Sequence, residues 1–257
     1  MVRHVIGVLA AATAFVASVA GTAFAQEKVL VAFGDSTTAR RDQDNVVVYA
    51  TLLDKAFAAQ NLSVKVVNAG IGGNNTTQGR TRFDRDVVAH KPSVVVIQFG
   101  LNDAAVDVWR NPPETSPRIS EKQYEENLRG FVQTLKGKGS EVILMTPNPA
   151  RWSEVLRKLY GKPPHRLDDP DGYNVFVSRY AEVVRKLASE EKVTLIDIYD
   201  IFQKYGKESG QSVDDLLLPD GMHPNSKGHE LIARLLLASK PVADRFAYNQ
   251  PAAEAKP

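Results

Sequence analysis

The chain has 257 residues, of which 32 are Lys or Arg, 30 are Asp or Glu and none is cysteine. A formal net charge of +2 gives no general attraction to nucleic acid or to an anionic membrane, so the strongly basic classes of binding protein are excluded. Without cysteine the protein has no thiol nucleophile, no thiolate metal site and no disulfide, and its stability must come from its core.

The first 25 residues have the pattern of a secretory signal peptide. A short basic start is followed by a long apolar run, which closes on the small-residue cleavage pattern at residues 23–25. A membrane anchor is the alternative, because residues 5–25 could nearly span a bilayer. The small residues at the exit and the polar residues 26–28 favour cleavage. We therefore expect an exported protein, periplasmic or secreted, with no stable membrane anchor after cleavage and a mature chain that starts at residue 26.

Short strands alternate with amphipathic helices along the chain. Runs rich in β-branched residues predict strands at 28–33, 64–67, 93–99, 141–146 and 193–198. Helical periodicity predicts helices at about 46–60, 79–90, 121–137, 173–190 and 225–239. This alternation indicates a parallel sheet with helices on both faces, and the continuous apolar run at 94–97 is typical of its central strand.

The pattern indicates one domain, residues 26–240, followed by a tail, residues 241–257, that loses periodicity and that we expect to be partly disordered. Two connections inside the domain, residues 103–120 and 147–172, are long and rich in proline, and they hold both tryptophans. Loops of this length without secondary structure are uncommon in a compact domain unless they are functional. We therefore expect them to take part in function.

Four segments carry the residues that could take part in catalysis or in binding a ligand. They are Phe-Gly-Asp-Ser-Thr at 33–37, a glycine loop at 68–74, Phe-Gly-Leu-Asn-Asp at 99–103 and Asp-Gly-Met-His-Pro at 220–224. The first three follow predicted strands, and the fourth lies in the last loop. Ligands of open parallel sheets bind beyond the carboxyl ends of the strands, so we expect the four segments to meet at one edge.

The residue types in these segments match those of nucleophilic catalysis. A serine hydroxyl such as that of Ser36 is a weak nucleophile until a base takes its proton, and the base needs an orienting group. Asp220 and His223, three residues apart around a glycine, could supply that pair. Backbone amides of Ser36 and of a glycine, together with the side-chain amide of Asn102, could bind the oxyanion of a tetrahedral intermediate.

Each segment also has a simpler interpretation. Residues 34–36 could form a turn with an N-cap, and Asn102 could cap the segment after it. The glycine loop could be a tight turn or a phosphate cradle, but it lacks the P-loop ending and the G-x-G-x-x-G spacing. Asp220 with His223 and His229 could suggest a metal site, but no H-E-x-x-H or comparable ligand set accompanies them, so we expect no metal.

The order of the motifs, GDS, a glycine loop, GxND and DxxHP, resembles that of the SGNH (GDSL-type) hydrolase superfamily over nearly the whole mature chain. The resemblance implies a flavodoxin-like, three-layer α/β/α sandwich with a five-stranded parallel sheet, and neither a metal nor an organic cofactor. It implies a catalytic triad of Ser36, Asp220 and His223, and an oxyanion hole formed by Ser36, Gly73 and Asn102.

Within the glycine loop the assignment rests on spacing. Gly73 lies five residues after Asn68, as in similar members of the family. Gly70 and Gly72 are close rivals.

The first motif reads Gly-Asp-Ser-Thr rather than Gly-Asp-Ser-Leu, which resembles the branch that includes rhamnogalacturonan and other carbohydrate O-acetylesterases. The resemblance implies hydrolysis of short-chain esters, acetyl esters above all, on a small-molecule or polysaccharide substrate; the near-neutral charge predicts no nucleic-acid partner. A sugar-binding rim is expected from the two long loops, made of Trp109, Arg110, Arg151, Trp152 and Tyr160. Either tryptophan could instead pack its loop onto the body of the protein, since large aromatic side chains are usually mostly buried. The alternatives are a lipase, arylesterase or thioesterase of the same family, or a carbohydrate-binding protein that has lost catalysis.

Overall fold

The structure is a computed structural model, and it describes Met1, residues 28–42 and residues 45–250. Residues 2–25 of the predicted signal peptide and residues 251–257 of the predicted tail lie outside the described residues. None of the helices in the described part of the chain is long and apolar enough to cross a membrane.

The centre of the molecule is a five-stranded parallel sheet in the order β2-β1-β3-β4-β5. Its strands are β1 (Lys28–Gly34), β2 (Val64–Gly70), β3 (Val94–Gln98), β4 (Glu141–Met145) and β5 (Thr194–Ile196). The five predicted strands and the parallel arrangement are therefore confirmed. In the register of the sheet, Gly34 is level with both Gly70 and Gln98, so the loops that follow β1, β2 and β3 leave the sheet at one edge.

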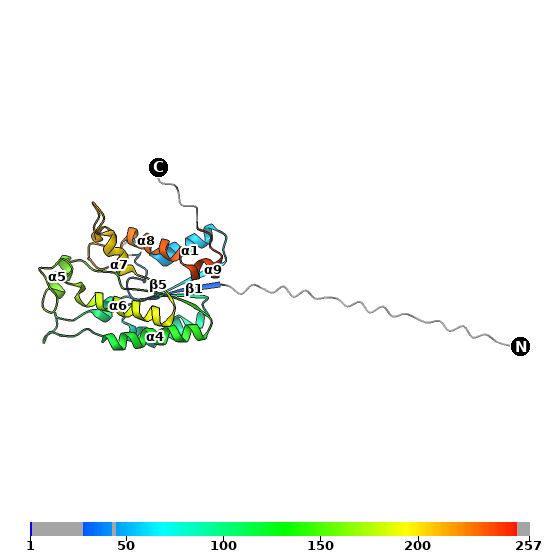
Figure 1. Cartoon of the computed structure of the whole chain (residues 1–257), viewed down its shortest axis with the longest axis horizontal. Helices are drawn as coiled ribbons and strands as arrows, with labels where there is room; N and C mark the ends of the chain where they lie inside the picture. Colours follow the sequence, from blue (N-terminus) through cyan, green and yellow to red (C-terminus); the bar gives the residue numbers. More distant parts are fainter. Residues whose placement is uncertain (2–27, 43–44, 251–257) are drawn as a thin grey trace.

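Helices cover both faces of the sheet, which confirms the three-layer α/β/α fold. One layer contains α1 (Tyr49–Ala59), α7 (Ile198–Tyr205), α8 (Ser226–Leu237) and α9 (Lys240–Phe246), and the other contains α2 (Thr76–Asp86), α4 (Glu121–Gly137) and α6 (Asn174–Glu191) (Figure 1). The short helices are α3 (Leu101–Ala104), α5 (Glu154–Tyr160) and 3₁₀ turns at Val88–His90 and Val213–Leu216.

Side chains of each strand alternate between two separate cores. In β1, Val31 and Phe33 face the core under α2, α4 and α6, whereas Leu30 and Ala32 face the core under α1 and α8. Strand β3 alternates in the same way and is buried along its whole length. Because both faces of the sheet are buried under helices, the strands are continuously apolar rather than alternating in polarity.

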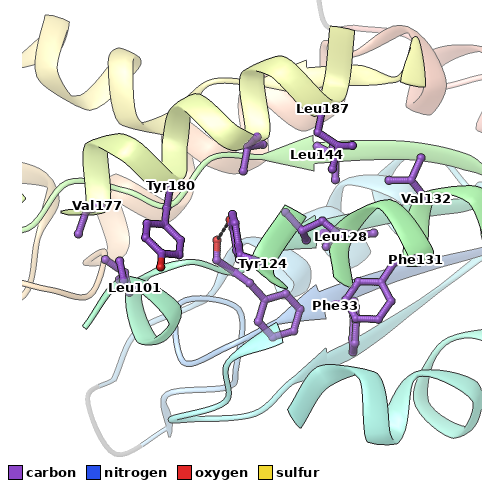
Figure 2. Packing of buried hydrophobic residues seen from close by; sticks show 14 of the residues in the cluster. Phe33, Leu101, Tyr124, Leu128, Phe131, Val132, Leu144, Val177, Tyr180 and Leu187 are labelled. Carbon is purple, nitrogen blue, oxygen red and sulfur yellow. Dashed lines mark hydrogen bonds between the residues drawn. The ribbon is translucent and has the colours of Figure 1, made fainter. Parts of the chain in front are cut away.

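The core on the α4 side also fixes the loop that follows β3. Figure 2 shows Tyr124 of α4 beside Tyr180 of α6, with ring centroids 4.9 Å apart. The buried hydroxyl of Tyr124 donates a 2.8 Å hydrogen bond to the carbonyl oxygen of Phe99, and the hydroxyl of Tyr180 donates to the carbonyl of Ile119. Both tyrosines thus bury their rings and use their polar ends to hold the two ends of the connection between β3 and α4.

The folded domain extends past residue 240, where the sequence predicted its end. Helix α9 begins at Lys240 with a proline in its first turn, and Val242 and Phe246 are buried. Phe246 packs edge-on against Phe57 of α1, with the ring centroids 5.2 Å apart. Two apolar residues one turn apart are too few to show helical periodicity in the sequence, although they are enough to dock a short helix.

Candidate active site

Ser36 lies in a tight turn at the carboxyl end of β1. The carboxylate of Asp35 accepts hydrogen bonds from both the amide and the hydroxyl of Thr37, each at 2.8 Å. Gly34 is required there, because a Cβ atom would lie 2.3 Å from the Thr38 hydroxyl oxygen and 2.4 Å from the Gln98 carbonyl oxygen. The turn therefore buries Asp35 and leaves Ser36 partly exposed.

His223 joins Ser36 to Asp220. The Nε2 atom of His223 lies 2.8 Å from Oγ of Ser36, and its Nδ1 atom lies 2.7 Å from Oδ2 of Asp220. Because the carboxylate can only accept, Nδ1 carries the proton and Nε2 is free to accept from the serine. The three residues thus form one continuous hydrogen-bonded chain.

The loop between Asp220 and His223 is held in place by its own backbone. Oδ1 of Asp220 accepts from the amides of Met222 (2.8 Å) and His223 (3.0 Å). Gly221 has a φ of +73°, and a Cβ atom there would lie 2.2 Å from the carbonyl oxygen of Arg151. The glycine is therefore needed for both the turn and its contact with the second long loop.

Asp220 is held in its charged form. Burial alone would raise the pKa of Asp220, but the bonds from the His223 ring and from the amides of His223 and Met222 outweigh that effect, and the pKa falls to about 2. Arg41 adds a cation, with Nη2 3.7 Å from Oδ2 of Asp220. A charged carboxylate at this position orients the imidazole through Nδ1.

The glycine loop lies beside Ser36. The amide of Gly70 is occupied by Oδ1 of Asn68 at 2.9 Å, which leaves it unable to bind a substrate. Gly72 has its nearest neighbour at Ser36, whose Cβ atom lies 4.0 Å from the place of an added Cβ. Gly73 has a φ of +77° and open space around it. Of the three glycines, Gly72 and Gly73 thus remain able to face a ligand.

Asn102 lies in the first turn of α3, directly after β3. Its Nδ2 atom donates to the carbonyl oxygen of Asn74 at 3.2 Å, which ties it to the glycine loop. The chain turns sharply at Gly100, whose φ is +139° and where a Cβ atom would lie 2.9 Å from the Pro147 ring. The loops after β1, β2 and β3 therefore converge around one point.

Two buried residues that are not among the predicted catalytic residues hold this arrangement together. Arg82 of α2, only 6% exposed, donates to the carbonyl oxygens of Ala69 (2.7 Å) and Gly34 (2.8 Å) and to Oδ1 of Asn74 (2.8 Å). Asp103 accepts from the amide of Thr76 at 2.9 Å and from its hydroxyl.

Neither residue stood out in the sequence for a role of its own. Asp103 is the last residue of the GxND motif, and Arg82 is a charged residue within an amphipathic helix. Burial raises the pKa of Asp103 to about 7, although the bonds from Thr76 act in the opposite direction.

The five predicted rim residues do not lie together. Trp109 is 50% exposed, and with Arg110 it lines a cleft of about 560 Å³ that also includes Gly73, Asn75 and Arg118. Arg151 pairs with Asp171 and contacts Gln203, Trp152 donates through Nε1 to the carbonyl oxygen of Asp169 at 2.9 Å, and Tyr160 is only 7% exposed. Only the first loop therefore contributes predicted rim residues to the cleft beside Gly73.

The described residues contain no group of three or more His, Cys, Asp or Glu side chains that could hold a metal ion. His229, considered above as a partner of Asp220 and His223, is fully buried, and its Nδ1 atom accepts from the amide of Tyr49 at 3.3 Å. Burial lowers the pKa of His229 to about 3, so the ring is neutral and packs as part of the core.

Comparisons with known proteins agree with this architecture. The model of the GDSL-like Lipase/Acylhydrolase family matches residues 32–231. An acetylxylan esterase of Geobacillus stearothermophilus is 31% identical over 179 residues, which cover 68% of this chain and 72% of that protein. An uncharacterized lipoprotein of Bacillus subtilis, YqeF, is 29% identical over 217 residues, which cover 79% of this chain and 85% of that protein.

A lipase/acylhydrolase from Enterococcus faecalis has a similar crystal structure, with a TM-score of 0.64 and 27% identity, over 87% of this chain and 100% of that one. The family model alone covers well over half of the sequence, including all four motif segments. The chain therefore belongs to the GDSL-like lipase/acylhydrolase family, a family of carboxylic ester hydrolases.

Proposed function

We propose that the chain is a serine esterase that hydrolyses short acyl esters through Ser36, His223 and Asp220. The observation that carries the proposal is the continuous contact from the Ser36 hydroxyl through the His223 ring to the Asp220 carboxylate, at 2.8 and 2.7 Å. A nucleophile, its base and an orienting carboxylate in this order are the parts that acyl transfer requires.

The reaction proceeds in two halves. The Oγ atom of Ser36 attacks the ester carbonyl carbon while Nε2 of His223 takes its proton. The proton then passes to the leaving alcohol oxygen as the carbon–oxygen bond breaks, which leaves an acyl group on Ser36. A water molecule repeats the sequence, giving its proton to His223, releasing the carboxylic acid and returning the proton to Ser36. No metal or organic cofactor takes part.

The oxyanion of each tetrahedral intermediate needs hydrogen-bond donors. We assign this role to the amides of Ser36 and Gly73 and to Nδ2 of Asn102. Gly73 lines the cleft and has open space around it, and Asn102 bonds to the same glycine loop. Donors fixed before the reaction stabilise charge without reorganising when it forms.

We further propose that the substrate is an acetyl ester carried by a carbohydrate. The cleft beside Gly73 offers the exposed face of Trp109 together with the polar side chains of Gln78, Arg110 and Glu114, a combination suited to a sugar ring with its apolar face and hydroxyl edge. The relationship to an acetylxylan esterase supports the same substrate class. Acetate release from acetylated xylan, pectin and simple sugars would separate this substrate from aryl, thio- and long-chain esters.

The test of the catalytic proposal is the Ser36→Ala variant, assayed with a chromogenic acetate ester. We expect turnover to fall by several orders of magnitude while the melting temperature stays near that of the wild type, since Ser36 is partly exposed. Turnover near the wild-type rate would reject Ser36 as the nucleophile. A wild-type protein that binds acetylated sugars but releases no acetate would instead support the non-catalytic alternative.

We also propose that the protein is exported after cleavage behind residue 25, from the signal pattern of the first 25 residues. The intact mass of the protein recovered outside the cytoplasm tests this proposal, because cleavage leaves a chain that begins at Gln26. A full-length mass in the membrane fraction would indicate the anchor instead.

A further inference from the structure

Arg118 joins the loop along the cleft to the oxyanion hole proposed above. Its Nη1 atom donates to Oδ1 of Asn102 at 3.3 Å, while its Nε and Nη2 atoms donate to Oδ1 of Asp107 at 2.9 and 2.7 Å. Nη2 also donates to the hydroxyl of Tyr160 at 3.3 Å. One guanidinium therefore contacts an amide at the site, a buried carboxylate and an aromatic residue of the second long loop.

These contacts determine which end of the Asn102 amide faces each neighbour. A guanidinium can only donate hydrogen bonds, so the atom of Asn102 that faces Arg118 must be the oxygen. The carbonyl of Asn74 can only accept, so the atom that faces it must be the nitrogen. The nitrogen carries two hydrogens, so its bond to Asn74 leaves a second one, which the assigned oxyanion role requires. A flipped amide would present its oxygen to the oxyanion and repel it.

The position of Arg118 is itself fixed. Asp107 is 2% exposed, and it accepts from Arg118 through Oδ1 and from Arg110 through Oδ2. The backbone amide of Arg118 donates to the carbonyl of Ala105 at 3.0 Å, which lies at the end of the helix that carries Asn102. Burial opposes the charged form of Arg118, but the bonds to Asp107 outweigh it and the pKa of the guanidinium lies above its ordinary value.

We propose that Arg118 is a positioning residue for catalysis, which acts through Asn102 by fixing the orientation of its amide in the oxyanion hole. This inference rests on the esterase function proposed above. A correctly oriented donor matters most when the carbonyl oxygen gains its charge, so Arg118 acts on the transition state rather than on the bound ester.

The first measurement is the steady-state kinetics of Arg118→Met with a small chromogenic acetate, which does not fill the cleft. We expect kcat to fall about 10-fold with little change in KM, a part of the roughly 100- to 1000-fold that loss of a whole oxyanion donor costs. Arg110 still contacts Asp107 in this variant, so the carboxylate keeps a cation. An unchanged kcat would overturn the proposal.

A matched control is Arg166→Gln, which removes another loop arginine that pairs with a carboxylate, Asp169, at 2.8 Å. Arg166 contacts none of the residues assigned to catalysis, so its kcat is expected to stay at the wild-type value. If Arg166→Gln lowers kcat as much as Arg118→Met does, the effect comes from general loosening of the loops and the proposal is wrong.

The second measurement distinguishes positioning from charge and from folding. In Arg118→Lys a cation remains beside Asp107, but an ammonium cannot reproduce the forked contacts of the guanidinium. We expect kcat to stay well below the wild-type value with an unchanged melting temperature. Full activity in Arg118→Lys would show that charge alone is sufficient, and would overturn a role in orientation even if Arg118→Met fails to fold.

The decisive measurement is a double-mutant cycle with Asn102→Ala. If Arg118 acts through Asn102, Arg118→Met should change kcat by less than about 2-fold once the amide is absent. Equal effects in both backgrounds would overturn the coupling. Loss of activity in Ser36→Ala together with additive Arg118 and Asn102 effects would leave the esterase function standing and reject only this inference.

Discussion

The two long loops have similar composition and opposite structural roles. In the cleft loop, residues 105–120, Trp109 is half exposed and the Arg110 guanidinium lies 5.6 Å from its ring centroid. In the packed loop, residues 147–172, the ring of Trp152 lies edge-on to Tyr173 at 5.8 Å and its nitrogen donates to the backbone of Asp169. A tryptophan whose nitrogen has a partner within its own loop packs that loop, whereas one left half exposed remains available to a ligand.

The two loops meet at Arg118, through its contact with the Tyr160 hydroxyl. The packed loop therefore contacts the cleft loop through Tyr160, and the cleft loop in turn contacts Asn102 of the site through Arg118. This division leads to a clear expectation: substitutions in the packed loop should affect stability, and substitutions along the cleft loop and at its contact with the site should affect catalysis or binding.

The largest effect is expected where the cleft loop touches the site, at Asn102. Asn102→Ala should lower kcat by roughly 100- to 1000-fold and change KM much less, because the lost hydrogen bond strengthens only as the oxyanion forms. Steady-state kinetics and a thermal melt on one preparation would check this. A normal kcat with a melting temperature lowered by the loss of about 1 kcal/mol would mean that Asn102 only holds the glycine loop through its bond to Asn74.

The next effect is on stability, in the packed loop. Trp152→Ala should lower the free energy of unfolding by about 3 kcal/mol, since it removes the ring that packs on Tyr173 and His165. Urea titration measures this directly. Its kcat on a small acetate should stay near the wild-type value, and a large loss of kcat without a loss of stability would contradict the division between the loops.

The matching change in the cleft loop is Trp109→Ala. It should leave the free energy of unfolding within about 0.5 kcal/mol of the wild type, because the side chain is half exposed. On acetylated xylooligosaccharides KM should rise about 5- to 10-fold, corresponding to the loss of about 1 kcal/mol of contact with a sugar ring. A small chromogenic acetate serves as the control substrate. An equal rise in KM for both substrates would argue against a sugar subsite at Trp109.

The smallest effect concerns pH. Burial lowers the pKa of His165 in the packed loop below its ordinary value of 6.5, an effect that backbone groups of Tyr173 and Val106 offset only in part. Below pH 6.5 the unfolded chain takes up a proton that the folded protein does not, so the stability contributed by neutral His165 is present above this pH and decreases as the pH falls.

In the wild type the rings of His165 and Tyr173 stack with their centroids 5.1 Å apart. His165→Phe keeps an aromatic ring at this position and removes the titratable imidazole. The free energy of unfolding of this variant should therefore decrease less between pH 7 and pH 5 than that of the wild type. Urea titrations at the two pH values give both slopes. An equal decrease in the two proteins would contradict the prediction, because it would mean that His165 takes up no more protons in the unfolded chain than in the folded one.

Sequence reasoning found the elements whose signals are local. The β-branched runs and the long amphipathic helices appear in the structure within a few residues of their predicted bounds, and helix α4 at Glu121–Gly137 has the predicted limits. Short helices such as α5 and α9 were missed, because one or two turns stabilised by tertiary contacts have little periodicity of their own.

The same distinction applies to the site. Ser36, His223 and Asp220 belong to short motifs, and the structure brings them into one hydrogen-bonded chain. Arg118 and Arg82 have no motif, since their importance depends on contacts with residues 16 and 48 positions away. Tyr160 was predicted at the rim, but it faces Tyr173 and His165, partners that become neighbours only when the packed loop folds.

The contact between Ser36 and His223 joins residues 187 positions apart in the chain. The last strand of the sheet ends at Ile196, whereas the proposed base and its carboxylate, His223 and Asp220, come later in the sequence, just before α8. Closing so long a loop is among the slower events of folding, because its entropy cost must be met before the contact forms. Ester hydrolysis should therefore be the last native property that a refolding chain regains, later than its circular dichroism, and a chain truncated before Asp220 should have no activity at all. In this protein enzyme activity is a measure of whether the chain has been made and folded at least as far as His223.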